Sequence, residues 1–281
     1  MQNSPILIIG KNAKTGWRVE RRLQAQGYPT RAVSRSTSPA FDWENQNTWR
    51  AAMTGARSAY ITFHPDLAIP TAEQTIRDFV ALAVELGLEH LVLLSGRGED
   101  GARRAEIVLE EGGLDWNIVR ASWFMQNFSE NFMIEGILNG ELMLPAGDIV
   151  EPFIAVDDIA EVAVATLPRK ALRNRDFEVS GPRAMTFAEC VETISAATGY
   201  PVKYTQIPIE AFIVGLREQG APEALLWLMR ELFTVVFDGR NSKPSSGVEE
   251  ALGRPPTDFS EYVRKVMATG AWDRSGLSQQ A

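Results

Sequence analysis

Short apolar runs alternate with longer amphipathic stretches over the first 120 residues of the chain. Ile6–Ile9 is apolar at every position and is followed by Gly10, a pattern typical of a strand buried on both faces. Apolar residues then recur at helical spacing from Gly16 onward, and Gly27 can end that helix. The same alternation predicts further strands over residues 30–34, 56–63, 90–95 and 115–120, with helices over residues 76–86 and 105–111.

Beyond residue 120 the alternation is less regular. Thr186 and Glu189 have the spacing of a capping box, which predicts a helix from there to Gly199. Asp158 and Glu161 predict a second helix start in the same way. The remaining elements that we expect are strands over residues 176–180 and 201–207, helical segments over 209–237 and 258–269, a loop over 241–247 and a frayed tail over 275–281.

Strand, helix and strand at this spacing indicate a parallel sheet with right-handed crossovers and helices on both faces. We therefore predict an α/β protein with a Rossmann-type doubly wound parallel sheet and a small C-terminal α/β substrate lobe. Residues 1–281 are expected to form one such domain, with its core over residues 1–160 and an interleaved, substrate-covering lobe over residues 161–272.

The charge balance argues against a nucleic-acid partner. The chain carries 28 basic and 36 acidic residues, a formal net charge of −8, so its overall field repels phosphate backbones. Hydrophobic residues make up 45% of the chain, which is ordinary for a folded protein and excludes the disordered and fibrous classes. A small-molecule partner is the expectation that remains.

Cys190 is the only cysteine, which rules out an internal disulfide framework and a cysteine-based zinc site. His64 and His90 have no third ligand at metal spacing, so no metal site is expected. The first residues lack the basic and apolar regions of a signal peptide, and no stretch reaches the ~18 apolar residues of a membrane span. We expect a cytoplasmic protein without a membrane partner, and the sequence leaves open whether it forms a homodimer.

The segment between the first strand and the first helix is a candidate phosphate-binding turn. A dinucleotide site needs a tight turn there, backbone N–H groups facing the pyrophosphate, and a helix N-terminus. Gly10 can supply the turn and Gly16 lets the helix pack on the sheet, while Ala13 stands where a further glycine is usual. The spacing excludes a P-loop, which would require lysine at position 16. The candidate residues are Gly10, Lys11, Asn12, Ala13, Lys14, Thr15 and Gly16.

The end of the second predicted strand favours NADP(H) over NAD(H). NAD-binding proteins place a carboxylate there for the ribose 2′-hydroxyl, whereas a 2′-phosphate requires an arginine and small hydroxyl groups. Ser34, Arg35 and Ser36 supply the second set, and no acidic residue stands among them. A solvated loop arginine is the alternative interpretation.

Several further segments accompany these two motifs: Phe41-Asp42-Trp43, Leu93-Leu94-Ser95, residues 120–128 and residues 152–160. Together they resemble the NmrA-like branch of the atypical short-chain dehydrogenases/reductases, and within it the bacterial NAD(P)H-binding proteins and the festuclavine and agroclavine dehydrogenases. The resemblance extends over about residues 5–272, and Trp-Phe-Met-Gln-Asn-Phe at 123–128 is its most specific part. Ala13 departs from the usual glycine and Ala121 from the usual proline.

The resemblance implies roles for residues beyond the two motifs. The turn from Gly10 to Gly16 would surround the pyrophosphate, and Arg35 would contact the 2′-phosphate. Thr62, Phe63 and His64 would lie along the cofactor, while Ser95 and residues 122–127 would line its nicotinamide end and the substrate site. The aromatic residues have a second interpretation, as core. The expected substrate-binding residues are Trp123, Phe124, Asn127, Phe128, Leu226 and Trp227.

The tyrosine–lysine pair of ordinary short-chain dehydrogenases is missing from this sequence. None of the five tyrosines has a lysine four residues later, and residues 65–120 contain neither residue type. Interconversion of alcohols and ketones therefore lacks its usual proton donor, whereas hydride transfer to a quinone, an iminium ion or another activated acceptor does not need so strong a donor. The expected catalytic residues are His64 and Ser95, with Glu99 and Asp100 as alternative acids.

These observations predict an NADPH-dependent oxidoreductase that reduces a small hydrophobic or aromatic electrophile without a tyrosine–lysine pair. The alternative is a non-catalytic, NADP-sensing regulatory protein of the NmrA type. The missing pair favours the regulatory protein, whereas the aromatic segment and Ser95 favour the enzyme.

Overall fold

The computed structural model describes residues 4–130 and 132–274, which divide into two compact units. The first comprises residues 4–121, 156–179 and 246–254, and the second comprises the described residues of 122–155, 180–245 and 255–274. The boundaries differ from the expected core and lobe, because 122–155 belongs to the second unit whereas 156–179 and 246–254 belong to the first. The expected tail over 275–281 lies outside the described residues.

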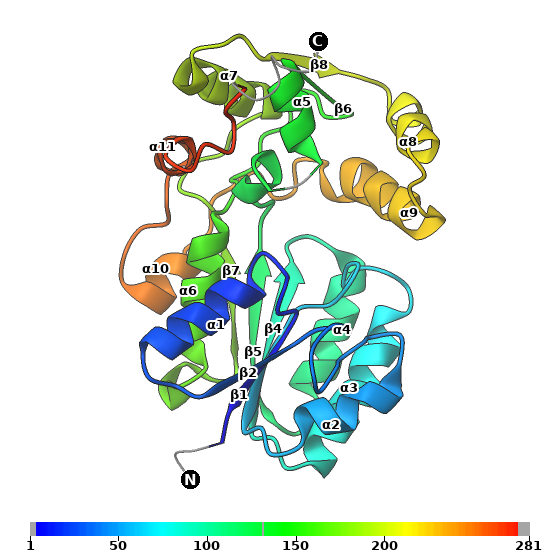
Figure 1. Ribbon diagram of the computed structural model, residues 1–281, viewed down its shortest axis with the longest axis vertical. Helices are drawn as coiled ribbons and strands as arrows, with labels where there is room; N and C mark the ends of the chain where they lie inside the picture. Colours follow the sequence, from blue (N-terminus) through cyan, green and yellow to red (C-terminus); the bar gives the residue numbers. More distant parts are fainter. Residues whose placement is uncertain (1–3, 131, 275–281) are drawn as a thin grey trace. The chain divides into compact units, whose positions relative to one another are not determined.

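The first unit is built on a six-stranded parallel sheet with the order β2-β1-β3-β4-β5-β7 (Figure 1). This order confirms the predicted doubly wound parallel sheet. Because β1 pairs with both β2 and β3, the winding direction reverses between β1 and β3, and ligands of such sheets bind outside the carboxyl ends at that point. The strands are β1 (Ile6–Ile9), β2 (Thr30–Val33), β3 (Ser58–Ile61), β4 (His90–Gly96), β5 (Asp115–Ala121) and β7 (Arg175–Val179).

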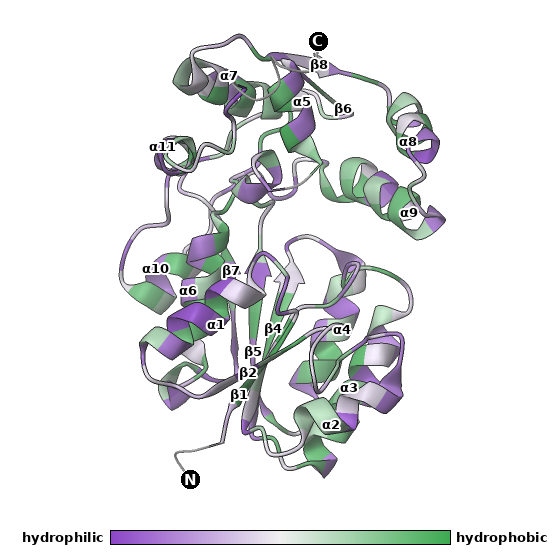
Figure 2. Ribbon diagram, in the orientation of Figure 1, coloured by the Kyte–Doolittle hydropathy of each residue, from purple (hydrophilic) through white to green (hydrophobic). Residues whose placement is uncertain are grey.

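Helices cover both faces of this sheet (Figure 1). One face carries α1 (Gly16–Ala25), α6 (Val156–Thr166) and α10 (Gly247–Leu252). The other face carries α2 (Trp49–Met53), α3 (Ala72–Glu85) and α4 (Asp100–Glu110). Figure 2 shows the hydrophobic residues of the first unit gathered on the strands and on the helix faces that pack against them. The sequence did not predict α2 and α10, because five- and six-residue helices are too short to show a helical period.

The second unit contains a two-stranded parallel sheet and several helices. Its sheet pairs β6 (Glu141–Leu144) with β8 (Lys203–Gln206). Only β8 was expected, because β6 exposes the apolar Met143 and its sequence therefore lacks a regular alternation of polar and apolar residues. The expected helical segment over 209–237 is divided near Gly220 and Pro222. The helices of the second unit are α5 (Met133–Asn139), α7 (Phe187–Thr198), α8 (Ile209–Glu218), α9 (Glu223–Glu231) and α11 (Phe259–Met267), with the π-helical turn η4 (Leu232–Val236) after α9.

The predicted capping box at the start of α7 is confirmed. Thr186 Oγ1 accepts a hydrogen bond from Glu189 N (3.1 Å), and Glu189 Oε2 accepts one from Thr186 N (2.7 Å). Gly199 ends the helix in the left-handed region, with φ of 76°. The box fixes the direction in which α7 leaves its loop, so that Phe187 packs in the aromatic core of the second unit.

Candidate cofactor site and proton donors

The turn after β1 has the backbone geometry that a dinucleotide phosphate site requires. Gly10 has φ of 94°, a conformation that disfavours any residue with a Cβ, and its carbonyl accepts a hydrogen bond from Ala13 N (2.8 Å). A Cβ on Gly16 would overlap the Gly10 carbonyl, so α1 begins as close to the turn as glycine permits. The first turn of α1 contains no acidic residue, which leaves its positive end available to an anion.

Thr62 lies beside this turn, at the point where the winding of the sheet reverses. Its hydroxyl donates to Ile9 O (2.9 Å), and a Cβ on Gly10 would overlap Thr62 Oγ1. Thr62 is itself buried, with 8% of its surface exposed. The structure therefore shows Thr62 as a residue that holds the turn, in addition to its predicted position along the cofactor.

Backbone hydrogen bonds join the loops that follow β1 and β2. The N–H groups of Gly10 and Lys11 both donate to Val33 O, at 3.2 and 3.0 Å, so the glycine turn is attached to the residue that immediately precedes Ser34. The side chains of Lys11 and Arg35 are exposed. This arrangement suits a phosphate group that would be contacted from both strand ends.

Hydroxyl groups hold the loop that carries Arg35. Ser34 N donates to Thr37 Oγ1 (2.9 Å), and Ser36 N donates to Ser34 Oγ (3.3 Å). The hydroxyl of Thr37 is in turn within hydrogen-bond distance of the carbonyls of Ser34 (2.9 Å) and Pro39 (2.8 Å). The loop is thus fixed by its own side chains, with Arg35 at its exposed tip.

Trp43 is a candidate site residue to which the sequence analysis assigned no role. Its indole N–H donates to Thr62 O (3.0 Å), and its ring centroid lies 4.8 Å from that of Phe63. Trp43 is only partly buried, so an aromatic surface follows the end of β3. The segment Phe41-Asp42-Trp43 is one of those that carry the sequence resemblance, and this could have identified Trp43 as a site residue.

His64 and two carboxyl groups occupy the loops after β3 and β4. His64 is exposed, whereas Asp66 is partly buried and accepts a hydrogen bond from Ala68 N (2.8 Å). The carboxyl groups of Asp66 and Glu99 are hydrogen-bonded to each other, and burial raises the pKa of Asp66. Two carboxyl groups that form such a bond share a proton, so this pair can hold an acidic proton at the carboxyl edge of the sheet.

Ser95 lies near the end of β4 and is buried. Its hydroxyl donates to Glu106 Oε1 (2.6 Å), and the same carboxylate accepts two hydrogen bonds from the Arg120 guanidinium, at 2.7 and 3.0 Å. Glu106 is completely buried. These contacts give Ser95 a structural partner that the sequence analysis did not foresee, and the catalytic role expected for Ser95 stays a prediction.

The residues predicted to bind substrate differ in exposure, and all of them belong to the second unit. Trp123 is partly buried against Phe233, at a ring-centroid distance of 5.0 Å, whereas Phe128 is completely buried. Leu226 and Trp227 are neighbours on α9 that differ in exposure, with 2% and 41% of their surfaces exposed. For Phe128 the structure therefore favours the alternative interpretation, as a core residue, and Leu226 is buried as well. The predicted residues that keep exposed or partly exposed surface are Trp123, Phe124, Asn127 and Trp227.

Ser122 follows β5 directly and carries a buried hydroxyl. Only 2% of this residue is exposed, and among the described residues its Oγ has no hydrogen-bond partner. A buried hydroxyl without a partner costs free energy, so a ligand group could satisfy it. This observation fits the expectation that the segment from residue 122 lines a ligand site.

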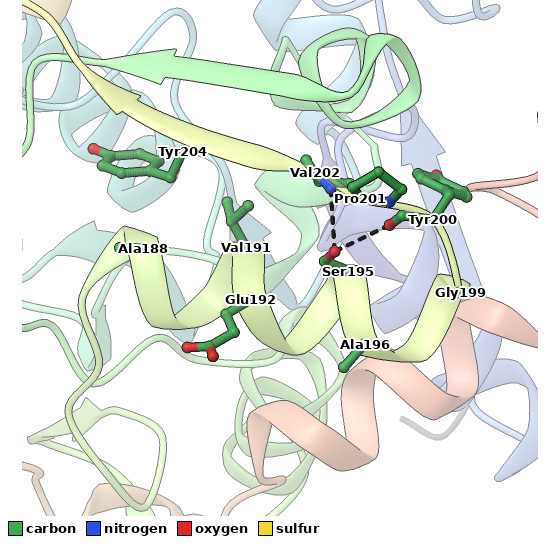
Figure 3. A pocket seen from close by; sticks show the side chains of 10 residues that line it. All are labelled: Ala188, Val191, Glu192, Ser195, Ala196, Gly199, Tyr200, Pro201, Val202 and Tyr204. Carbon is green, nitrogen blue, oxygen red and sulfur yellow. Dashed lines mark hydrogen bonds between the residues drawn. The ribbon is translucent and has the colours of Figure 1, made fainter.

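A separate cavity of about 520 Å³ lies between α7 and β8 (Figure 3). The hydroxyl of Ser195, which lines the cavity, is hydrogen-bonded within the protein: Ser195 Oγ donates to Tyr200 O (3.0 Å) and accepts from Val202 N (3.1 Å). None of the predicted substrate-binding residues lines it. The cavity therefore does not correspond to the predicted site.

The residues that the structure describes include no cluster of three or more histidine, cysteine, aspartate or glutamate side chains that could hold a metal ion. No described helix combines the length and the apolar character needed to cross a membrane.

An open parallel sheet with a glycine turn at its winding reversal defines the class of dinucleotide-binding α/β proteins. No family model matches the sequence. Curated relatives do match it. An NAD(P)H azoreductase from Xenophilus azovorans is 27% identical over 92% of this chain and 96% of its own length. An agroclavine dehydrogenase from Claviceps fusiformis is 26% identical over the same shares. Prestalk A differentiation protein A from Dictyostelium discoideum is 26% identical over 92% of this chain and 84% of its own length.

Solved structures share the fold over nearly the whole chain. The triphenylmethane reductase of Citrobacter sp., complexed with NADP(H), superposes with a TM-score of 0.79 at 16% identity and covers 93% of this chain and 99% of its own. An NADPH-dependent quinone oxidoreductase from Escherichia coli, complexed with NADPH, has a TM-score of 0.78 at 17% identity with the same coverage. The curated relatives confirm the resemblance to the agroclavine dehydrogenases, and the solved structures share the fold.

Proposed function

We propose that this protein is an NADPH-dependent reductase of small hydrophobic or aromatic electrophiles such as quinones and iminium ions. It is an oxidoreductase that uses NADP(H). One of its relatives is an NAD(P)H azoreductase, and another is an agroclavine dehydrogenase. A quinone oxidoreductase of the same fold was solved with NADPH. The observation that carries the proposal is the attachment of the glycine turn to the end of β2, which puts the exposed residues Lys11 and Arg35 on neighbouring loops.

The preference for the phosphorylated cofactor rests on what surrounds Arg35. The first acidic residue after β2 is Asp42, and its Oδ1 accepts a hydrogen bond from Glu44 N (3.1 Å). Residues 34–41 thus offer no carboxylate for a ribose 2′-hydroxyl, whereas Ser34 and Ser36 offer hydroxyl groups next to a guanidinium. Such a set favours a 2′-phosphate.

When bound, NADPH supplies the hydride. The chain supplies a cradle for its phosphates at the Gly10 turn and an aromatic wall at Trp43 and Phe63. The structure gives no support to a tyrosine hydroxyl as the proton donor. The hydroxyls of Tyr200 and Tyr262 donate to Trp272 O (2.9 Å) and Ser129 Oγ (2.8 Å), and burial raises the pKa of Tyr60 well above its ordinary value. The acceptor should therefore be an electrophile that already spreads or neutralises the incoming charge.

Reduction of a quinone also requires a proton, and the Asp66–Glu99 pair is our candidate source. Hydride addition to a quinone gives the hydroquinone anion, and one proton from the pair completes the hydroquinone; water then reprotonates the pair. His64 is the second candidate, because it is exposed on the same loop as Asp66. The raised pKa of Asp66 keeps its acid form populated to higher pH than an ordinary aspartate.

The proton source can be tested by pairing two acceptors. With a quinone, kcat should fall as pH rises through the raised pKa of Asp66, and D66N should remove that dependence. An iminium acceptor needs no proton, so with this acceptor kcat should not fall in that way with pH, either in the wild-type protein or in D66N. H64Q serves as the comparison on the same loop. If H64Q rather than D66N removes the pH dependence, His64 is the donor and the carboxyl pair is not.

The cofactor assignment is tested by titrating NADPH and NADH against the protein and following nucleotide fluorescence. R35A should weaken NADPH binding by about 10- to 100-fold, the loss expected for one charge-assisted contact, and leave NADH binding unchanged. Equal affinities for the two nucleotides in the wild-type protein would overturn the assignment. Tight NADPH binding without NADPH consumption across a panel of quinones, iminium salts and aldehydes would favour the NADP-sensing alternative.

A further inference from the structure

We propose that a cavity at the amino-terminal edge of the main sheet binds a small anion through the oxygens of a phosphate or carboxylate group. The cavity has a volume of about 470 Å³ and lies entirely within the first unit. Ile6 and Ser58, the first residues of β1 and β3, contribute to its wall. The glycine turn follows the opposite, carboxyl end of β1, so this cavity is not the proposed cofactor site.

Among the described residues, those that line the cavity carry positive charge and no carboxylate. Its charged lining residues are Arg57, Lys170 and Arg173. Arg57 Nε lies 3.0 Å from Glu89 Oε2, and Arg173 Nη1 lies 2.8 Å from Asp115 Oδ2, so each arginine has one acidic partner outside the wall. Lys170 makes no ion pair with any residue that the structure describes. Its charge is therefore not compensated, and the cavity as a whole attracts anions.

Arg173 provides the strongest sign of a missing partner. Only 7% of its side chain is exposed, and within the described part of the chain its buried Nε has no hydrogen-bond partner. Folding removes this N–H from water without replacing the lost hydrogen bond, which is unfavourable unless a ligand supplies an acceptor. A guanidinium with an unused N–H matches the oxygens of a carboxylate or phosphate.

The remaining wall limits the size and character of the ligand. Tyr28, Pro29, Leu167 and Pro168 line the cavity and present ring and aliphatic surfaces. The volume exceeds what an inorganic anion needs, so an anionic group attached to a small apolar or aromatic body fits better than a bare ion. Benzoate and phenyl phosphate represent this chemistry, and inorganic phosphate represents the anionic group alone.

The test is calorimetric titration of the full chain with benzoate, phenyl phosphate and inorganic phosphate at constant ionic strength. The two aromatic anions should bind saturably and more tightly than phosphate. K170A should weaken their binding about tenfold, and R57A should weaken it similarly, because each removes one cation from the wall. K203A is the matched control: Lys203 is an exposed lysine in the second unit, paired with Glu141 at 3.1 Å, and its removal should leave binding unchanged.

The same variants separate this proposal from the proposed function. NADPH titrations of K170A and R57A should match those of the wild-type protein, since both residues lie at the amino edge of the sheet. No heat of binding at millimolar concentrations of the anions would overturn the proposal, as would binding that K170A and R57A leave unaltered. Loss of NADPH binding in these variants would instead show that the cavity belongs to the cofactor site, and would refute the proposal of a separate anion site.

Discussion

His90 begins β4 in the interior of the sheet, and its neutral form should stabilise the protein. The residue has no exposed surface, and its Nε2 lies 2.9 Å from Asn117 Oδ1. The Asn117 amide nitrogen donates to Leu172 O and Arg175 O, so the amide oxygen faces the ring and Nε2 carries the hydrogen. Burial, and then the charge of Arg173, lower the pKa of His90 to about 4.

The size of the effect follows from the difference between the folded and unfolded pKa values. Between pH ~6.5 and pH ~4 the unfolded chain takes up a proton at this histidine and the folded chain does not, so the free energy of unfolding falls as the pH drops through that window. The full contribution, present above pH ~6.5, is about 3 kcal/mol, and about 2 kcal/mol of it is lost on going to pH ~5.

The perturbation is H90Q, which keeps an N–H for Asn117 Oδ1 and removes the titrating group. Urea unfolding, followed by tryptophan fluorescence, gives the free energy of unfolding at about pH 7.5 and about pH 5. Between these conditions the wild-type protein should lose about 2 kcal/mol more than H90Q. H64Q, which replaces the other histidine, should lose as much as the wild-type protein. An equal loss in H90Q and the wild-type protein would refute the reasoning.

Three further predictions concern the turn, the buried carboxylate and the aromatic residues. G10A should lower the free energy of unfolding by about 2 kcal/mol or more and weaken NADPH binding, because φ of 94° and the neighbouring Thr62 exclude a Cβ; unchanged urea unfolding would contradict this. E106Q should lower the free energy of unfolding by about 3 kcal/mol, since it leaves the Arg120 guanidinium without its buried charged partner. An unchanged free energy of unfolding would show that the ion pair contributes little. F128A should lower the free energy of unfolding by about 3–5 kcal/mol, whereas W227A should change it by less than about 0.5 kcal/mol and raise the KM for an aromatic acceptor. The reverse pattern would show that Trp227 belongs to the core and that Phe128 binds substrate.

Residues close together in the sequence carried most of the correct predictions. Ile6–Ile9 followed by Gly10, and Thr186 followed by Glu189, each specify a local structure that neighbouring residues can complete, and the structure has both. The short elements α2 and β6 were not predicted. The five residues of α2 do not establish a helical period, and the exposed Met143 in β6 removes the alternation of polar and apolar residues.

The division into two units could not have been read from the order of residues. The chain passes between the units at residues 121–122, 155–156, 179–180, 245–246 and 254–255, so each unit is assembled from separated segments. Composition changes little at these points, and what assigns a segment to its unit is packing with distant residues. The expected boundary near residue 160 was drawn without knowledge of which distant residues pack together.

The sequence by itself determined the parallel α/β class, the glycine turn and the absence of an acidic residue after β2, because each depends on residue type and local spacing. Only the tertiary structure decided which side chains meet. It joined Ser95 to Glu106 and Asp66 to Glu99, and it placed Phe128 in the core. These contacts are made between segments whose separation along the chain says nothing about their distance in space, and that distance is set by the packing of the whole unit.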